Sequence, residues 1–118
     1  MLDKNAILAA NDLKTQDVEV TEWGGTVRVR TMSGREREQF MVAVSEGEAI
    51  VDPNQRIGEL MRRLLVTTLV GEDGQRLFTD EDVDALADKS AEVLQRLFTV
   101  AQSLNGFGIK ATDDIAKN

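Results

Sequence analysis

The hydrophobic pattern of the chain centres on one segment, residues 56–70. Its apolar positions recur every three or four residues, the spacing of one helix face, at Ile57, Leu60, Met61, Leu64, Leu65, Thr68 and Leu69. Val66 and Val70 widen this face to more than half of the circumference. A helix with so little polar surface must be covered from two sides. We therefore predict a central buried helix around which the rest of the chain packs.

Residues 17–31 alternate between valine and polar side chains, which predicts a β-hairpin. The valines lie on both sides of Gly24-Gly25, a dipeptide that suits a two-residue turn, at Val18, Val20, Val27 and Val29. Such a turn sets a register in which Val20 lies opposite Val29 and Glu19 lies opposite Arg30. The valine face is expected to lie on the core, and the other face in water.

Four further helices are predicted from capping residues and apolar spacing, at residues 1–11, 33–46, 79–88 and 90–104. Asp3 is the expected N-cap of the first, whose apolar face is so small that it should hold only by docking on the core. Ser33 and Glu36 form a capping box for the second, and Asn105-Gly106 ends the last. The residues of the third that should face inward are Val83, Leu86 and Ala87.

The predicted fold class is mainly α, within the α+β class. We expect four to five helices around the central buried helix, with one β-hairpin near the N-terminus. Pro53 should begin or directly precede the central helix, and Asp73-Gly74 predicts a tight turn after it. We expect a single domain over residues 1–109 and a mobile polar tail over residues 110–118.

The composition argues against most kinds of chemistry. The 118 residues include no cysteine and no histidine, which removes disulfides, thiolate ligands and the commonest general base. The spacing of Asp80, Asp82 and Asp84 is that of the start of a calcium loop, but Ala85 and Ala91 stand where such a loop needs glycine and an acid. We therefore expect no enzyme activity, no metal and no other cofactor.

Charge and hydropathy restrict the surroundings of the protein. No apolar run approaches the roughly 18 residues of a membrane-spanning helix, and the first residues lack the features of a signal peptide. We expect a cytoplasmic protein that does not bind membranes. The net charge of −7, from 14 basic and 21 acidic residues, disfavours binding to nucleic acid because phosphate backbones repel an acidic domain.

Binding to other proteins remains, and two sets of residues are candidates near the N-terminus. Arg28, Arg30, Arg35 and Arg37 form a basic run, which is either a solvated face beside neighbouring acids or a docking patch for an acidic partner. Trp23 is the only tryptophan. It either folds back over the helices, the interpretation we favour, or stands exposed as an anchor for a partner.

The last helix offers a third candidate surface. Its apolar face includes Phe98, and Phe107 and Ile109 follow directly after its predicted end. These two residues either fold back against the helix, as apolar residues after a glycine C-cap commonly do, or form an exposed ligand for another subunit.

The order of these features resembles that of tail assembly chaperones from long-tailed, siphovirus-type bacteriophages and prophages. The similarity lies in residues 6–13, 18–25, 27–30 and 33–37, and again in residues 64–71, 77–80 and 104–106. Its most specific part is the Trp23-Gly24-Gly25 hairpin followed by the helix start at Ser33. The resemblance covers nearly the whole chain.

The resemblance implies a chaperone of virion assembly in the cytoplasm of the host bacterium. Such proteins bind the long, helical tape measure protein, help the major tail protein polymerise around it, and are not retained in the virion. They self-associate, so we expect a homo-oligomer, either a ring or a spiral. Many are made in two forms through a translational frameshift. Because Ala116-Lys117-Asn118 is compatible with an A-rich slippery sequence, we hypothesise that this chain is the short form.

Two other functions stay open at this stage. One is a permanent structural protein of the tail or of the head–tail junction. The other is a small nucleic-acid-binding regulator that uses the basic run, although the net charge argues against it.

Overall fold

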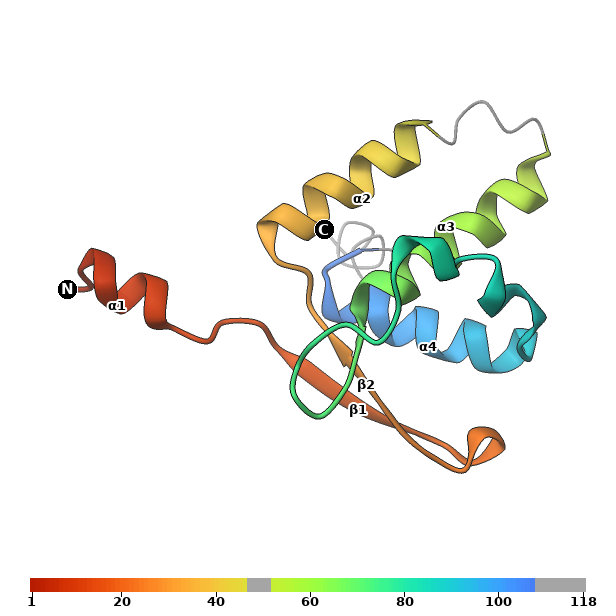
Figure 1. The fold of residues 1–118 in the computed structure, drawn as a ribbon, viewed down its shortest axis with the longest axis horizontal. Helices are drawn as coiled ribbons and strands as arrows, with labels where there is room; N and C mark the ends of the chain where they lie inside the picture. Colours follow the sequence, from red (N-terminus) through yellow and green to blue (C-terminus); the bar gives the residue numbers. More distant parts are fainter. Residues whose placement is uncertain (47–51, 108–118) are drawn as a thin grey trace, which may run out of the picture.

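A small antiparallel sheet and three helices make up the body of the described chain, and a further helix stands apart from it (Figure 1). The structure is a computed structural model, and it describes residues 1–46 and 52–107. The helices are α1 (Lys4–Ala9), α2 (Gly34–Glu46), α3 (Pro53–Thr68) and α4 (Ala91–Leu104). The strands are β1 (Thr15–Val20), β2 (Gly25–Arg30) and β3 (Leu69–Val70), in the order β1-β2-β3. The predicted class, mainly α within α+β, is confirmed.

The core lies between α3, α4 and one face of the sheet. Every residue from 64 to 70 is buried, which confirms the central position of the second half of α3. The sheet contributes Val20 and Val29, and α4 contributes Leu97 and Ala101, all with no exposed surface. Thr68 is also fully buried, and its hydroxyl donates to the Leu64 carbonyl at 2.8 Å, so its polar group is satisfied inside the core.

The prediction for the central helix was wrong about the burial of its first half and about where it ends. Ile57, in the first half of α3, is 60% exposed, so only the second half is covered on all sides. The helix also ends at Thr68, and Leu69 and Val70 continue directly as β3, with Leu69 opposite Val29. An apolar run has no feature that separates a buried helix from a buried strand. Pairing with a strand far away in the sequence decides the change.

The hairpin forms with the predicted faces but not with the predicted register. Val18 lies opposite Val27, and Val20 lies opposite Gly25, whereas we predicted Val20 opposite Val29. The connection is a 3₁₀ turn (η1, Thr21–Trp23) that ends at Gly24 in the left-handed conformation, with φ +76°. The longer turn shifts the pairing by an even number of residues. Each side chain therefore keeps its face, because the side-chain period of a strand is two.

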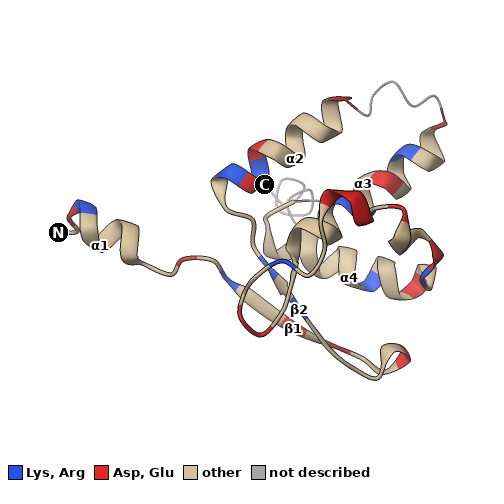
Figure 2. Ribbon diagram, viewed as in Figure 1, with Lys and Arg blue, Asp and Glu red and all other residues tan. Residues whose placement is uncertain are grey.

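The predicted capping residues are confirmed in three helices, and the predicted start at Pro53 in a fourth. The Ser33 hydroxyl accepts from the Glu36 N–H at 3.2 Å, and the Glu36 carboxylate accepts from the Ser33 N–H at 2.9 Å. Asp3 caps α1, Ser90 caps α4, and Pro53 follows the Asp52 cap at the start of α3. Basic and acidic residues alternate at the start of α2 (Figure 2).

The segment before α4 differs from the predicted helix at residues 79–88. It forms two 3₁₀ turns, η3 (Asp80–Asp82) and η4 (Ala85–Asp88), the first with a capping box between Thr79 and Asp82. Val83 and Leu86 face inward as predicted, but Ala87 is exposed. Asp73-Gly74 forms the predicted turn, with Gly74 at φ +79°.

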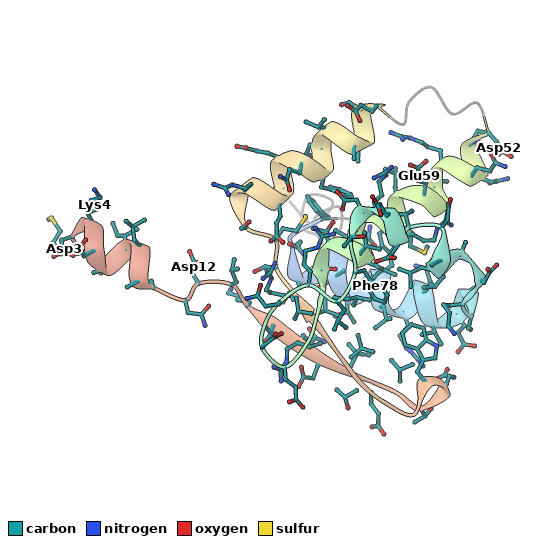
Figure 3. All side chains as sticks on the ribbon, in the orientation of Figure 1. Asp3, Lys4, Asp12, Asp52, Glu59 and Phe78 are labelled. Atoms are coloured by element: carbon teal, nitrogen blue, oxygen red, sulfur yellow. The ribbon has the colours of Figure 1, made fainter. Side chains whose placement is uncertain are left out.

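The prediction that the first helix docks on the core was wrong. Residues 1–12 are all exposed, and α1 contributes no buried side chain. Figure 3 shows Asp3, Lys4 and Asp12 on a segment that projects away from the body. The short apolar face of α1 is therefore left uncovered by the described part of the chain.

The predicted tail over residues 110–118 lies outside the described residues. Among the helices that the structure describes, none combines the length and the apolar character needed to cross a membrane.

Candidate functional site

An apolar groove lies between the three helices of the body. Its volume is about 330 Å³. Seven apolar side chains and one amide line the groove. They are Phe40, Met41 and Val44 of α2, Leu60 and Leu64 of α3, Phe98 and Gln102 of α4, and Phe107 after α4. Leu64 belongs to the buried core, whereas Met41 is 50% exposed at the rim. The groove therefore runs from open solvent down to the core.

The α2 wall of the groove is fixed by a network around Arg30. Its Nη2 atom donates to both carboxylate oxygens of Glu36, at 2.6 and 2.7 Å, and Nη1 donates to the Gly74 carbonyl at 3.1 Å. The two charged side chains are only 15% and 14% exposed. Because Glu36 also caps α2, one carboxylate joins the sheet to the start of that helix.

Phe107 is brought to the groove by the end of α4. The Gly106 N–H donates to the Ser103 carbonyl and the Phe107 N–H donates to the Gln102 carbonyl, which is the hydrogen-bond pattern of a Schellman motif. Gly106 has φ +78°, the left-handed conformation that this motif requires. The chain turns back, and the Phe107 ring stacks on Phe40 with 6.4 Å between the ring centres.

Two charged groups border this aromatic pair and the hairpin. The Arg37 guanidinium lies 4.3 Å from the centre of the Phe107 ring, within the range of a cation–π contact. Trp23 is half-buried and packs against the core, with the Lys89 ammonium 5.9 Å from its ring centre. Trp23 thus folds back over the helices.

The basic run does not form a single patch. Arg28 pairs with Asp17 across the hairpin at 2.8 Å. The predicted register had instead placed Glu19 opposite Arg30. Arg30 is directed to Glu36 and the 71–77 turn, Arg37 covers Phe107, and Arg35 is exposed. The hydrogen bond from Arg28 lowers the pKa of Asp17 below its ordinary value of 3.8, and that pair raises the pKa of Arg28.

A second ion pair connects the hairpin turn to α4. Arg96 donates to Glu22 at 2.8 Å. The pKa of Glu22 lies below its ordinary value of 4.5. The larger cause is the hydrogen bond that its carboxylate accepts from its own backbone N–H, and the bond from Arg96 adds to it. These pairs hold the hairpin in place, and neither contributes to the groove.

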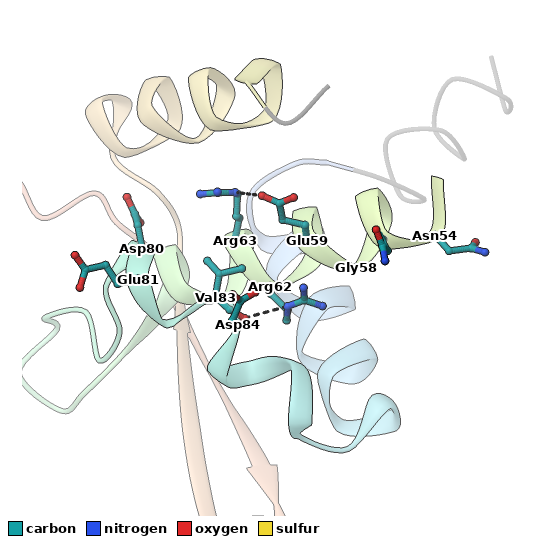
Figure 4. Close-up of a pocket in the computed structure, with 10 residues that line it drawn as sticks. Asn54, Gly58, Glu59, Arg62, Arg63, Asp80, Glu81, Val83 and Asp84 are labelled. Carbon is teal, nitrogen blue, oxygen red and sulfur yellow. Dashed lines mark hydrogen bonds and ion pairs between the residues drawn. The ribbon is translucent and has the colours of Figure 1, made fainter. Parts of the chain in front are cut away.

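A second, polar cleft of about 660 Å³ lies on the other side of α3 (Figure 4). Arg63 donates to Glu59 at 2.9 Å, and Arg62 donates to the Val83 carbonyl at 3.0 Å. The acids of its remaining wall are Asp80, Glu81 and Asp84. They do not converge on a common point, and within residues 1–46 and 52–107 no group of three metal-ligating side chains could hold an ion.

Of the predicted contact residues, the structure brings Phe98 and Phe107 together in the groove and leaves Trp23, Arg28, Arg30 and Arg35 elsewhere. Ile109 lies outside the described residues. Sequence reasoning missed Phe40, Met41 and Leu60 as groove residues because their helical spacing is the same as that of core positions.

Comparisons with known proteins give a family and a similar fold. A family model described as phage tail assembly chaperone matches residues 2–118. Among solved structures, the chain is similar to the tail assembly chaperone of bacteriophage HK97, with a TM-score of 0.64 and 21% identity over 85% of this chain and 94% of that one. No curated protein sequence matches. At this identity the solved structure supports the fold, and the match over residues 2–118 shows that the chain belongs to the phage tail assembly chaperone family.

Proposed function

We propose that the protein binds the tape measure protein of a long-tailed phage, in the host cytoplasm, through the groove between α2, α3 and α4. It keeps that protein soluble, promotes polymerisation of the major tail protein around it, and is released before the virion is complete. The proposal includes no catalytic step, no cofactor and no nucleic acid. The observation that carries it is an almost wholly apolar groove on a member of this chaperone family.

The groove suits one face of an amphipathic helix. Such a helix places apolar side chains in a groove at three- and four-residue spacing and leaves its polar face in water. Three side chains of the groove are aromatic, Phe40, Phe98 and Phe107, and Met41 at the rim is a residue that adapts to different partners. A surface of this kind binds apolar helix faces without requiring one particular sequence. A chaperone of a long helical protein needs this property.

Two neighbouring residues of α2 allow a matched test. Met41 and Val42 are 50% and 56% exposed, but only Met41 lines the groove. In Met41→Asp, a charge replaces a side chain whose burial contributes about 1.5–3 kcal/mol, so we expect binding of tape measure fragments to weaken at least about tenfold. Val42→Asp makes the same change in charge outside the groove and should bind as the unchanged protein does.

The binding can be measured by isothermal titration calorimetry with purified helical fragments of the tape measure protein of the same phage. Equal binding by the two variants would place the client on another surface. No binding by the unchanged protein would refute the proposed function itself. Mass spectrometry of purified virions tests release, because a permanent tail component would be detected there in stoichiometric amounts.

A further inference from the structure

The outer edge of β1 is open along its whole length. β1 lies at one side of the sheet, and β2 is its only neighbouring strand among the described residues (Figure 1). The Thr31 N–H donates to the Lys14 carbonyl at 2.9 Å, which fixes the alternation of hydrogen bonds along the β1–β2 ladder. Every second residue from Lys14 onward therefore bonds to β2, whereas Thr15, Asp17 and Glu19 direct their backbone N–H and carbonyl groups outward. All three of these residues are exposed.

The opposite edge of the same sheet is closed by the chain itself. β3 is only two residues long, and the segment that follows it folds back along it. Val70 forms a β-bridge with Arg76, and the Leu77 N–H donates to the Leu69 carbonyl at 3.1 Å. β1, in contrast, lacks the features that commonly block an edge, because its six residues include no proline and no lysine and pair with β2 without a bulge. The described sheet thus has one free edge, formed by the outward backbone groups of β1, which we call the β1 edge.

Charge selects the kind of strand that can pair with the β1 edge. The side chains of Asp17 and Glu19 alternate with the valines of β1, so they lie on the face of the sheet away from the core. Arg28 pairs with Asp17, whereas Glu19 lies opposite Thr26 and forms no ion pair within the described residues. Glu72 lines a shallow hollow of about 280 Å³ together with Asp17 and Arg28. Three carboxylates therefore accompany a single guanidinium beside this edge.

A second copy of the chain is a poor partner for the β1 edge. Pairing of two β1 strands would bring the carboxylates of both copies together, and like charges opposite each other destabilise a strand pair. A basic segment has the opposite effect. Side chains of adjacent strands lie about 4.5–5.5 Å apart at their Cβ atoms, so lysine or arginine side chains on an added strand reach Asp17 and Glu19. The alternate side chains of that strand would lie beside Val18, which is half-buried, and apolar side chains suit this position.

We propose that the β1 edge binds an extended segment of another protein in which basic and apolar side chains alternate. The segment adds a strand to the sheet, and its backbone bonds to the outward groups of Thr15, Asp17 and Glu19. The β1 edge shares no residue with the groove between the helices, so the protein offers separate surfaces to two different chains. Only the occupant of the groove rests on the proposed function.

Hydrogen exchange of single backbone amides tests the contact directly. The probe is a peptide of about seven residues in which lysine and valine alternate. Its binding should slow the exchange of the Thr15, Asp17 and Glu19 amides at least about tenfold, whereas the Gln16 and Val18 amides, which already bond to β2, should change little.

Four results of this experiment would overturn the proposal. They are absence of binding, protection confined to other parts of the chain, equal binding of a peptide with glutamate in place of lysine, and protection of the outward amides in the protein alone that increases with its concentration. The last result would show that a second copy occupies the β1 edge.

Two variants at one position separate the charge from the backbone. Glu19→Gln removes the carboxylate and should weaken peptide binding about two- to fivefold. Glu19→Pro also removes the outward N–H, which takes no part in the β1–β2 ladder, and should weaken binding by about a further fivefold. Equal binding by the two variants would show that the backbone of the edge is not used. If Glu19→Pro is less stable in urea than Glu19→Gln, Thr15→Pro makes the same backbone change at the first residue of the strand and takes its place.

The groove supplies the remaining control. Met41→Asp changes the groove but leaves β1 intact, so this variant should bind the alternating peptide as the unchanged protein does. Loss of peptide binding in Met41→Asp would place the peptide in the groove and refute the β1 edge as its site. If tape measure fragments fail to bind the unchanged protein while the peptide still protects the outward amides, the proposed function fails and the β1 edge stands.

Discussion

Replacing Glu36 should destabilise the protein, because its carboxylate joins the sheet to the start of α2. Glu36→Ala removes the partner of Arg30, and a hydrogen bond between charged groups contributes about 1.5–3 kcal/mol. It also removes the bond to the Ser33 N–H, which contributes about 0.5–1 kcal/mol. The two side chains are about 15% exposed, so water screens the pair only weakly. We expect a loss of about 2–4 kcal/mol in the free energy of unfolding.

The assay is urea denaturation followed by circular dichroism, with a thermal melt as a second measure. For 118 residues, 1 kcal/mol corresponds to about 4 °C in Tm, so the expected fall is about 8–16 °C. Glu38→Ala is the matched control, because Glu38 is exposed on the same helix and should change stability by less than about 0.5 kcal/mol. If Glu36→Ala were within that margin of the control, the network would not hold α2 in place.

Two other predictions concern the core and the hairpin. Leu97→Ala, at a fully buried position, should lose about 2–5 kcal/mol in the same urea assay, whereas Leu77→Ala, at a position that is 57% exposed, should lose little. Asp17 has a lowered pKa because Arg28 donates to it, so its contribution is present above pH 3.8 and is lost as the pH falls below that value. Urea titrations from pH 7 to pH 3 should therefore show the unchanged protein losing its advantage over Asp17→Asn at the acidic end, and a constant difference would contradict this account.

Local signals in the sequence predicted the ends of elements well. The Ser33–Glu36 capping box, the Ser90 cap and the glycine at position 106 act over three or four residues, so a single sequence contains all that they need. The faces of the hairpin were predicted for the same reason, because alternation is local.

Features that depend on distant partners could not be predicted in this way. The register of the hairpin followed from an assumed turn, and the four-residue connection through Trp23 replaced it. The end of α3 at Thr68 depends on Val29, about forty residues earlier in the chain. The groove was divided between two predictions: Phe98 and Phe107 were proposed as contacts, whereas Leu60 was assigned to the core. Apolar spacing alone identifies a face of a helix and not what covers it.

The direct passage from α3 into β3 has a consequence for folding. Leu64, at the base of the groove, and Leu69, in the sheet, are separated by a single helical turn with no loop between them. No flexible segment therefore separates α3 from β3, so the helices and the sheet cannot unfold independently at this point. Amide protons from both layers should exchange with deuterated solvent at one common, slow rate set by global unfolding, and a client held in the groove would retard that rate in the sheet as well.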